Sequence, residues 1–450
     1  MATSLGTTSP NRREHARDRA VRAAVAQGLL SAEEPVTALL DTAGIRASAA
    51  ALTSAFAAVT DAPVLHAFAV KAAPLVPVLR LLYEAGLGAE VASPGELALA
   101  RAAGVPPSRT VLDSPAKTHA ELRQALGLGI AVNADNLQEL ARLDGLLPSA
   151  ADAPPIGLRV NPQVGAGAIG AMSTATATSK FGVALRDDGA REAVVQAYLD
   201  RPWLTRLHTH TGSQGVPLPL MAEGVRAAYA LAEEINDRAG RRQIDTLDIG
   251  GGLPVNFASD EDTPTYAAYA GLLAATVPGL FDGRYALVTE FGRSLLAKHG
   301  TVLARVEYTK TSGGRPIAVT HAGVQLAVRT VYAPDSWPLR ILAYDADGRP
   351  RAGEPAVVQD VAGPACFAGD LLATGRALPP LRPGDVVAVP DTGAYYFAHH
   401  YAYNSLPRPA VYGFTRAAEG GTVFSVVRRA QTLDEIVTES GGGRPDALTA

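Results

Sequence analysis

The chain has 450 residues, of which 47% are hydrophobic and 19% are charged, and its formal net charge is −4. This length predicts two domains, and the composition is that of an ordinary globular protein. So small a charge gives no reason to expect nucleic acid or an acidic membrane as a partner, and no apolar run is long enough to predict a membrane span. We therefore expect a cytoplasmic protein.

The two ends of the chain are expected to pack poorly. Residues 1–34 begin with a stretch rich in Arg, Ser and Thr that lacks the apolar core of a signal peptide, which predicts a disordered N-terminal arm. Residues 35–46 contain a strand-like run that we expect to join a C-terminal β domain. Residues 436–450 include three consecutive glycines and are expected to form a flexible tail.

Residues 47–296 alternate between strand-like and helix-like patterns. Repeated units of this length predict parallel strands with helical crossovers, and about eight of them in roughly 250 residues favour a (β/α)8 barrel over an open doubly wound sheet. The strand-like runs are 64–70, 89–92, 110–113, 130–133, 156–160, 204–208, 246–249 and 285–289.

Residues 297–435 show a different pattern of short β-rich runs, punctuated by Gly and Pro, without clear long helices. This pattern predicts an all-β barrel or sandwich domain, so the fold class is α/β plus all-β. The runs are 301–308, 317–321, 327–332, 339–343, 356–360, 385–389 and 422–427.

One lysine is informative because of its place in this pattern. Lys71 follows the apolar run that starts at Val64 and precedes a helix-like segment, so we expect it at the carboxyl end of a parallel strand, where such barrels carry their chemistry. A lysine desolvated there can lower its pKa and form a Schiff base with an aldehyde. Taken alone, a lysine at a strand end more often reaches into solvent.

Two further patterns follow strands. The run from Gly250 to Gly252 can bring backbone N–H groups onto a phosphate, although a triple glycine alone is more often a flexible turn. His208 and His210 point to the same side of a strand, where a flat imidazole can stack on an aromatic cofactor. No nearby set of Cys, His or carboxylate residues has obvious zinc spacing, so we expect no metal.

Glu290 and Arg293 follow the last strand of the series, where barrels place phosphate ligands. A surface ion pair is the simple interpretation. The functional one is that Glu290 keeps a pyridine nitrogen protonated and Arg293 adds positive charge to a phosphate. Together with an aldehyde-capturing amine, a phosphate-binding loop and a stacking imidazole, these residues form the set that pyridoxal 5'-phosphate requires, and we predict this cofactor.

The order and spacing of these motifs resemble the alanine racemase-fold decarboxylases that use pyridoxal phosphate, the diaminopimelate and ornithine decarboxylase group of fold type III. The resemblance covers residues 35–430, and it implies a pyridoxal phosphate-binding barrel. Besides the motifs above, it rests on residues 68–72, 90–96, 158–162, 179–182, 208–214, 363–370, 391–395 and 403–404.

The resemblance implies a role for each matching residue. It implies that Lys71 binds the cofactor covalently, that His210 stacks on its ring and that Glu290 pairs with the ring nitrogen. It also implies that Cys366, the only cysteine, or else Lys71 protonates the α-carbon, and that Cys366 reaches across the interface of a homodimer into the partner's active site. The residues implied to hold the phosphate are Ser213, Gly250, Gly251, Gly252, Arg293 and Tyr395, and Gly292 is also implied to bind the cofactor.

The departures from the family concern the substrate. Decarboxylases of basic substrates carry a carboxylate directly after the cysteine, and this chain has Phe367 there. A phenyl ring cannot neutralise a buried ammonium group, so we expect an apolar or aromatic amino acid rather than diaminopimelate, ornithine or lysine. Arg329 matches a family arginine that meets a distal carboxylate, which leaves an acidic substrate open. Tyr332 and Tyr395 complete the implied substrate site.

Two alternatives remain. An amino-acid racemase, or an enzyme with other pyridoxal phosphate chemistry on the same fold, shares most of these motifs, but that racemase has an arginine where this chain has Glu290. A non-catalytic cofactor-binding protein would need neither Lys71 nor Cys366. We therefore predict a carboxy-lyase that acts on a small amino-acid substrate, works as a homodimer with shared active sites, and has no nucleic-acid or membrane partner.

Overall fold

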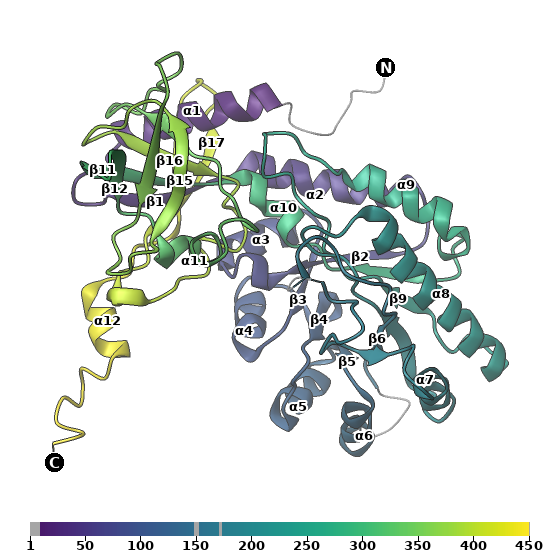
Figure 1. The fold of residues 1–450 in the computed structure, drawn as a ribbon. Helices are drawn as coiled ribbons and strands as arrows, with labels where there is room; N and C mark the ends of the chain where they lie inside the picture. Colours follow the sequence, from purple (N-terminus) through teal and green to yellow (C-terminus); the bar gives the residue numbers. More distant parts are fainter. Residues whose placement is uncertain (1–9, 148–152, 171–172, 450) are drawn as a thin grey trace. The chain divides into compact units, whose positions relative to one another are not determined.

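The computed structural model describes residues 10–147, 153–170 and 173–449, which divide into two units (Figure 1). The first unit comprises Arg46–Asn256 and Asp262–Leu295. The second comprises the described residues up to Ile45, the short segment Phe257–Glu261, and the chain from Leu296 onward. No helix in these ranges is long and apolar enough to cross a membrane.

Within the described ranges of the first unit, eight parallel strands close into a barrel. Their order is β5-β4-β3-β2-β10-β9-β8-β6, and pairing of β5 with β6 closes the ring. The predicted (β/α)8 barrel is therefore confirmed. The strands are β2 (Val64–Ala69), β3 (Gly88–Val91), β4 (Thr110–Asp113), β5 (Ala131–Ala134), β6 (Ile156–Asn161), β8 (Leu204–His208), β9 (Thr246–Asp248) and β10 (Ala286–Thr289).

Helices lie around the outside of this barrel (Figure 1). Local side chains fix where several of them begin: Ser93 accepts a hydrogen bond from the N–H of Glu96, and Thr118 forms a capping box with Glu121. The helices are α2 (Thr42–Ala57), α3 (Val76–Glu84), α4 (Pro94–Ala102), α5 (His119–Leu128), α6 (Leu137–Leu146), α7 (Ala190–Leu199), α8 (Leu218–Ala239) and α9 (Tyr266–Thr276).

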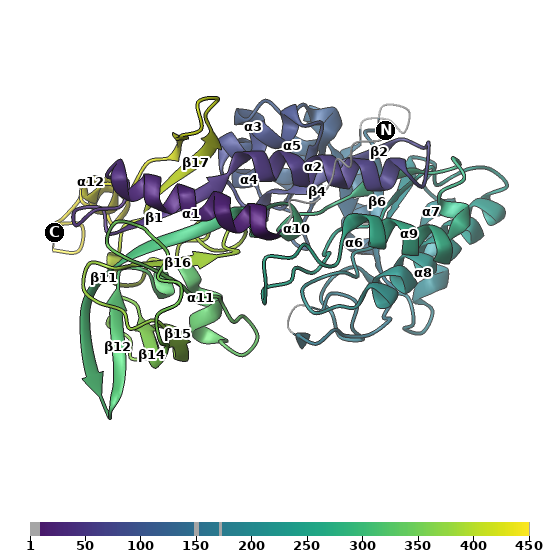
Figure 2. The same ribbon diagram turned by 90° about the horizontal axis from the view of Figure 1, so that it is seen from above.

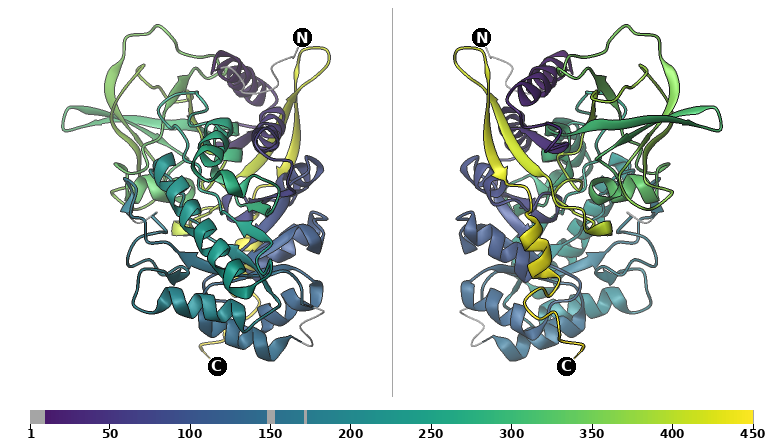
Figure 3. Two further views of the ribbon diagram at one scale, coloured as in Figure 1. Left: turned by 90° about the vertical axis from the view of Figure 1, so that its right-hand side faces the viewer. Right: turned by 90° about the vertical axis from the view of Figure 1, so that its left-hand side faces the viewer.

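The second unit is built on a separate sheet. Strand β1 (Val36–Asp41) pairs antiparallel with β11 (Gly300–Ser312) and parallel with β17 (Ala410–Arg416), so the N-terminal strand joins the C-terminal domain as predicted. Strand β11 continues into a long hairpin with β12 (Figure 2), and β17 forms another hairpin with β18 (Figure 3). The other strands are β12 (Arg315–Thr320), β13 (Leu342–Tyr344), β14 (Val357–Ala362), β15 (Leu371–Leu378), β16 (Val386–Pro390) and β18 (Thr422–Arg428).

The N-terminal arm differs from the prediction. Helix α1 spans Pro10–Ala26, and Ala20, Val21 and Ala24 are buried against the core of the second unit. These small apolar residues recur at the spacing of one helix face. Their packing against the core stabilises the helix, which an isolated polar segment could not form on its own. The expected disordered arm is therefore wrong for this part of the chain. Helix α12 (Leu433–Glu439) likewise extends into the predicted flexible tail.

The segment predicted as a strand at residues 327–332 is also different. It belongs to helix α11 (Val324–Tyr332), which carries Arg329. The β-branched residues of this segment favour a strand, but Asp370 lies 46 residues away in sequence and its Oδ1 accepts a hydrogen bond from the N–H of Val324 at 2.6 Å. This long-range cap fixes the beginning of the helix, and no local pattern reveals it.

The stability of the barrel is predicted to depend on pH through His66, on β2. Its Nδ1 lies 2.8 Å from the Thr289 hydroxyl, and burial, reinforced by the charge of Arg109, lowers the pKa of His66 from 6.5 to about 4. Below pH 6.5 the unfolded chain binds a proton that the folded chain does not, so stability is lost as the pH falls from 6.5 towards 4.

Replacing His66 by Gln should reduce the difference in unfolding free energy between pH 7 and pH 5 by about 2 kcal/mol. Urea unfolding at the two pH values measures this difference. The matched control is His119→Gln, because His119 is exposed at the start of α5. An equal pH dependence in the His66 variant and the native protein would contradict the prediction.

Candidate active site

Three of the four predicted catalytic residues, Lys71, His210 and Glu290, lie at one end of the barrel, and the fourth, Cys366, belongs to the second unit. Lys71 lies in a short 3-10 turn directly after β2, His210 follows β8, the triple glycine follows β9, and Glu290 follows β10. Parallel strands bring all these carboxyl ends to the same side of the barrel. Residues separated by more than 200 positions in the chain therefore share one site.

Lys71 forms an ion pair that the sequence did not predict. Its Nζ lies 2.7 Å from Oε2 of Glu90, on β3; the Lys71 side chain is 38% exposed, whereas that of Glu90 is fully buried. Burial, offset in part by the charge of Lys71, raises the pKa of Glu90 to about 7. Glu90 can therefore hold a proton near neutral pH, which suits a lysine that must lose its own proton before it reacts as a nucleophile.

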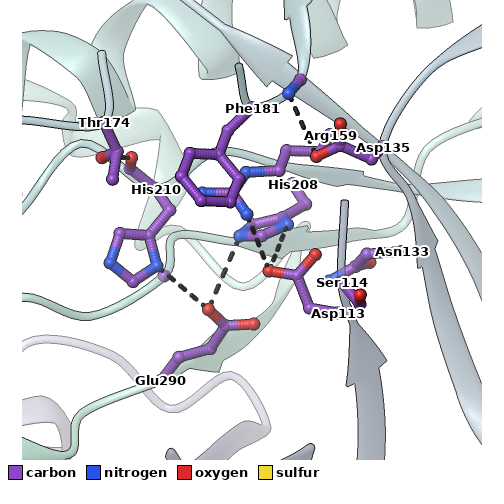
Figure 4. Close-up of polar contacts among 12 residues, drawn as sticks. Asp113, Ser114, Asn133, Asp135, Arg159, Thr174, Phe181, His208, His210 and Glu290 are labelled. Atoms are coloured by element: carbon purple, nitrogen blue, oxygen red, sulfur yellow. Dashed lines mark hydrogen bonds and ion pairs between the residues drawn. The ribbon is translucent and has the colours of Figure 1, made fainter. Parts of the chain in front are cut away.

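Glu290 is fully buried between two imidazole rings (Figure 4). Its Oε2 lies 3.1 Å from Nδ1 of His210 and 3.6 Å from Nε2 of His208, as predicted for histidines on the same side of a strand. Burial and the nearby Arg159 and Lys71 lower the pKa of His210 well below its usual value, so this ring is neutral at pH 7. The three groups are also compact enough for a metal ion, although the sequence predicts none.

A second buried network lies behind these rings (Figure 4). Asp113, at the end of β4, accepts a hydrogen bond from Nη1 of Arg159 at 3.1 Å and lies 3.7 Å from Nδ1 of His208. Burial works to raise the pKa of Asp113, but the charges of Arg159 and other neighbours outweigh it and hold the pKa below its usual range. The guanidinium of Arg159 also lies 4.5 Å from the ring centre of Phe181. His208 thus lies between Asp113 and Glu290, and neither of its ring nitrogens makes a hydrogen bond within the described residues.

The triple glycine is required by close backbone packing. A Cβ atom on Gly251 would lie 2.1 Å from the carbonyl oxygen of Glu290, and one on Gly252 would lie 1.9 Å from that of Gly212. Gly250 and Gly252 also have positive φ angles of 67° and 86°. The simple interpretation as a flexible turn is therefore wrong, because this backbone is tightly packed between the ends of two strands.

The remaining predicted ligands of the first unit lie near the same strand ends. Gly292 packs closely against the turn that carries Lys71, since a Cβ there would lie 2.9 Å from that of Ala72. Arg293 begins helix α10 (Arg293–Leu296) and is buried, and Ser213 is half-buried in the loop after β8. The structure thus brings Gly292 towards Lys71, while the roles of Ser213 and Arg293 stay predictions.

The second unit holds the predicted substrate residues. The Arg329 guanidinium lies between two aromatic rings, 4.5 Å from the ring centre of Tyr395 and 5.2 Å from that of Trp337. Its Nη1 is buried and has no hydrogen-bond partner within the described chain. Stacking holds the charged group in place while leaving a donor unused, which is an arrangement suited to an anionic ligand.

Cys366 is exposed, so it is not the small buried residue that a lone cysteine usually is. Its N–H donates to Oδ1 of Asn404 at 2.7 Å, and its carbonyl oxygen accepts a hydrogen bond from the Tyr403 hydroxyl at 3.2 Å. Asn404 and Ser405 have positive φ angles of 55° and 51°, so a strained turn presents these groups to the cysteine backbone. The backbone of Cys366 is thereby fixed while its thiol faces solvent.

The site in the barrel suits the predicted cofactor on its own geometry. Oε1 of Glu290 is buried without a hydrogen-bond partner in the described residues. Burial, reinforced by the negative charges of Asp248 and Asp113, raises the pKa of Glu290 well above its usual value. A protonated ring nitrogen would supply the missing partner and the missing positive charge. The glycine backbone and Arg293 would hold the phosphate, and Lys71 the aldehyde carbon.

A comparison with protein families matches residues 43–297 to the pyridoxal binding domain of the pyridoxal-dependent decarboxylases. The chain belongs to this family. It is similar to diaminopimelate decarboxylases of Aquifex aeolicus (31% identical over 375 residues, 83% of this chain and 85% of that protein) and Pseudomonas aeruginosa (33% over 381 residues, 84% and 87%). The solved Helicobacter pylori diaminopimelate decarboxylase complexed with L-lysine shares the fold, with a TM-score of 0.79 at 24% identity, over 93% of this chain and 100% of that chain.

These comparisons confirm the predicted family, the cofactor and the reaction class. The protein is a pyridoxal phosphate-dependent carboxy-lyase that acts on an amino acid. They do not support the expectation that excludes diaminopimelate, because relatives that match more than four-fifths of the chain are named for that substrate.

Several residues of the site were missed by sequence reasoning. Glu90 and Arg159 lie within motifs that carry the family resemblance, but the sequence predicts no role for them. Asp113 and Asp248 are predicted only as parts of strands. Each lies in a strand or at its end, where an acidic or basic residue inside an apolar run signals a buried charge that needs a partner. The identity of the partner depends on how the barrel closes.

Proposed function

We propose that this decarboxylase acts on an α-amino acid whose side chain ends in a second carboxylate, with diaminopimelate as the first candidate. The observation that carries this proposal is Arg329, held between Tyr395 and Trp337 with a buried donor unused. A planar guanidinium with a free donor suits a carboxylate, whereas an apolar side chain would leave it unsatisfied. The named substrate of the relatives has such a distal carboxylate.

The chain's own residues then have distinct tasks. Bound pyridoxal phosphate supplies the sink for the electrons that remain when CO2 leaves. Glu90 takes the proton that Lys71 must lose to react, and Glu290 holds a proton on the ring nitrogen. Neutral His210 offers its flat face, and the thiol of Cys366 delivers a proton to the α-carbon. Glu290 also favours decarboxylation over racemisation, since an arginine at this position would oppose protonation of the ring.

We further propose a homodimer in which Cys366 of one subunit serves the barrel of the other. The fixed backbone and solvent-facing thiol of this residue suit a group that acts outside its own fold. In a two-fold symmetric dimer each subunit would then contribute Lys71 to one site and Cys366 to the other.

CO2 release from a panel of amino acids tests the substrate. The purified protein with pyridoxal phosphate should release CO2 from diaminopimelate and not from lysine, because lysine lacks the distal carboxylate. Replacing Arg329 by Gln should raise KM for diaminopimelate by about tenfold or more, the cost of a lost charge-assisted hydrogen bond. Arg416→Gln, on an exposed arginine of the same unit, is the control. Release from apolar amino acids but not from diaminopimelate would contradict the proposal.

Mixing two inactive variants tests the dimer. Lys71→Ala and Cys366→Ala are each expected to release little CO2. After mixing and exchange of subunits, half of the dimers contain one of each subunit, and each mixed dimer has one intact site of two, so about a quarter of native activity should return. Size-exclusion chromatography gives the oligomeric state in parallel. No recovery from a mixture that demonstrably exchanges subunits would contradict a shared site.

A further inference from the structure

Two loops of the barrel approach each other at the predicted phosphate site. One follows β8 and carries Ser213, and the other follows β9 and carries the triple glycine. Their backbones lie so close that a Cβ atom on Gly212 would clash with the carbonyl oxygen of Gly251. Glycine removes this clash, but it has no side chain that could hold the loops together. Any bond that fixes their spacing must therefore come from the backbone or from neighbouring residues.

The side chain of Gln214 forms such bonds with one residue of the opposite loop. Its Nε2 donates to the carbonyl oxygen of Val255 at 2.8 Å, and its Oε1 accepts a hydrogen bond from the N–H of Val255 at 3.0 Å. Gln214 follows Ser213 directly, and Val255 comes shortly after Gly252. Two hydrogen bonds from one planar amide fix the orientation of the loops as well as their distance, which a single bond does not.

A tight turn fixes the backbone from which Gln214 reaches across. The N–H of Val216 donates to the carbonyl oxygen of Ser213 at 3.1 Å, so that Gln214 and Gly215 occupy the second and third positions of the turn. Gly215 has a φ of 83°, which a type II turn requires at its third position. The N–H of Ala168 also donates to the carbonyl oxygen of Gly215 at 2.9 Å, which ties the turn to a third segment.

The link from Val255 back to the triple glycine is short and stiff. Only Leu253 and Pro254 separate Val255 from Gly252. The side chains of Leu253 and Val255 are buried, which anchors this stretch, and the ring of Pro254 restricts its own φ. A displacement of Val255 would therefore move the end of the glycine loop.

We propose that Gln214 is a positioning residue for the phosphate of the cofactor. The groups predicted to bind the phosphate include the Ser213 hydroxyl and the backbone N–H groups of the triple glycine, and these lie on the two loops that Gln214 joins. Donors that are already held at the right spacing bind an anion more tightly than donors that must first be brought together. The inference concerns retention of the cofactor and does not depend on which amino acid is decarboxylated.

The test compares pyridoxal 5'-phosphate with pyridoxal, which has the same ring and aldehyde but no phosphate. Each compound is titrated into the whole chain after removal of the cofactor, and visible absorbance gives the two Kd values. Gln214→Met keeps a side chain of similar length without charge and removes both hydrogen bonds. It should weaken binding of pyridoxal 5'-phosphate about tenfold, as expected for the loss of two neutral hydrogen bonds. Binding of pyridoxal should stay unchanged, which also reports that the variant is folded.

Gln359→Met is the matched control. The Gln359 side chain, on β14 of the second unit, also bridges backbone groups: it donates to the carbonyl oxygen of Pro379 at 2.8 Å and accepts from the N–H of Leu381 at 3.3 Å. This variant should keep the native preference for pyridoxal 5'-phosphate over pyridoxal.

A second variant, Gln214→Asn, keeps the amide but is one carbon shorter, so it cannot form both bonds and should lower the preference as well. A native preference in both Gln214 variants would overturn the inference. An equal loss of preference in Gln359→Met would also overturn it, because the effect would then not be specific to the phosphate loops.

Discussion

The excess of buried carboxyl groups at the mouth of the barrel is the constraint on which the site depends. Glu90, Asp113, Asp248 and Glu290 are all buried there, and the cations that face them most closely are Lys71 and Arg159. Unpaired buried charges are costly, so some of these groups must hold protons or share partners. Burial, reinforced by the neighbouring carboxyl groups, raises the pKa values of Glu90 and Glu290. A cofactor that brings a protonated ring nitrogen would relieve this shortage of positive charge.

Backbone packing is the second requirement of this arrangement. The glycine loop after β9 approaches the backbone at Glu290 and at Gly212 more closely than any side chain would allow. The N–H of Glu290 also donates to the carbonyl oxygen of Gly250 at 2.7 Å. The loop that would receive the phosphate and the carboxylate that would face the ring nitrogen are thus held at a fixed spacing, and neither can shift without the other.

The barrel and most of its site residues could be predicted from the sequence because their signals are local. Each strand is a short apolar run, and Lys71, His210 and Glu290 follow such runs directly. Helix α11 could not be predicted, because Asp370 caps it from a distant loop. The pairing of Lys71 with Glu90 depends on two strands lying side by side, and the fixed backbone of Cys366 depends on a left-handed turn at Asn404. Such features follow from tertiary structure, and local patterns in the sequence do not reveal them.

Chemical trapping tests most directly whether Lys71 carries the cofactor in a decarboxylase site. The holoenzyme is treated with sodium borohydride, which makes a lysine-bound pyridoxal group permanent, and the modified peptide is identified by mass spectrometry while CO2 release is followed. We predict that Lys71 is modified and that activity is lost in proportion to the modification. Modification of another lysine, such as the buried Lys117 that pairs with Glu139, or full CO2 release after complete reduction, would contradict it.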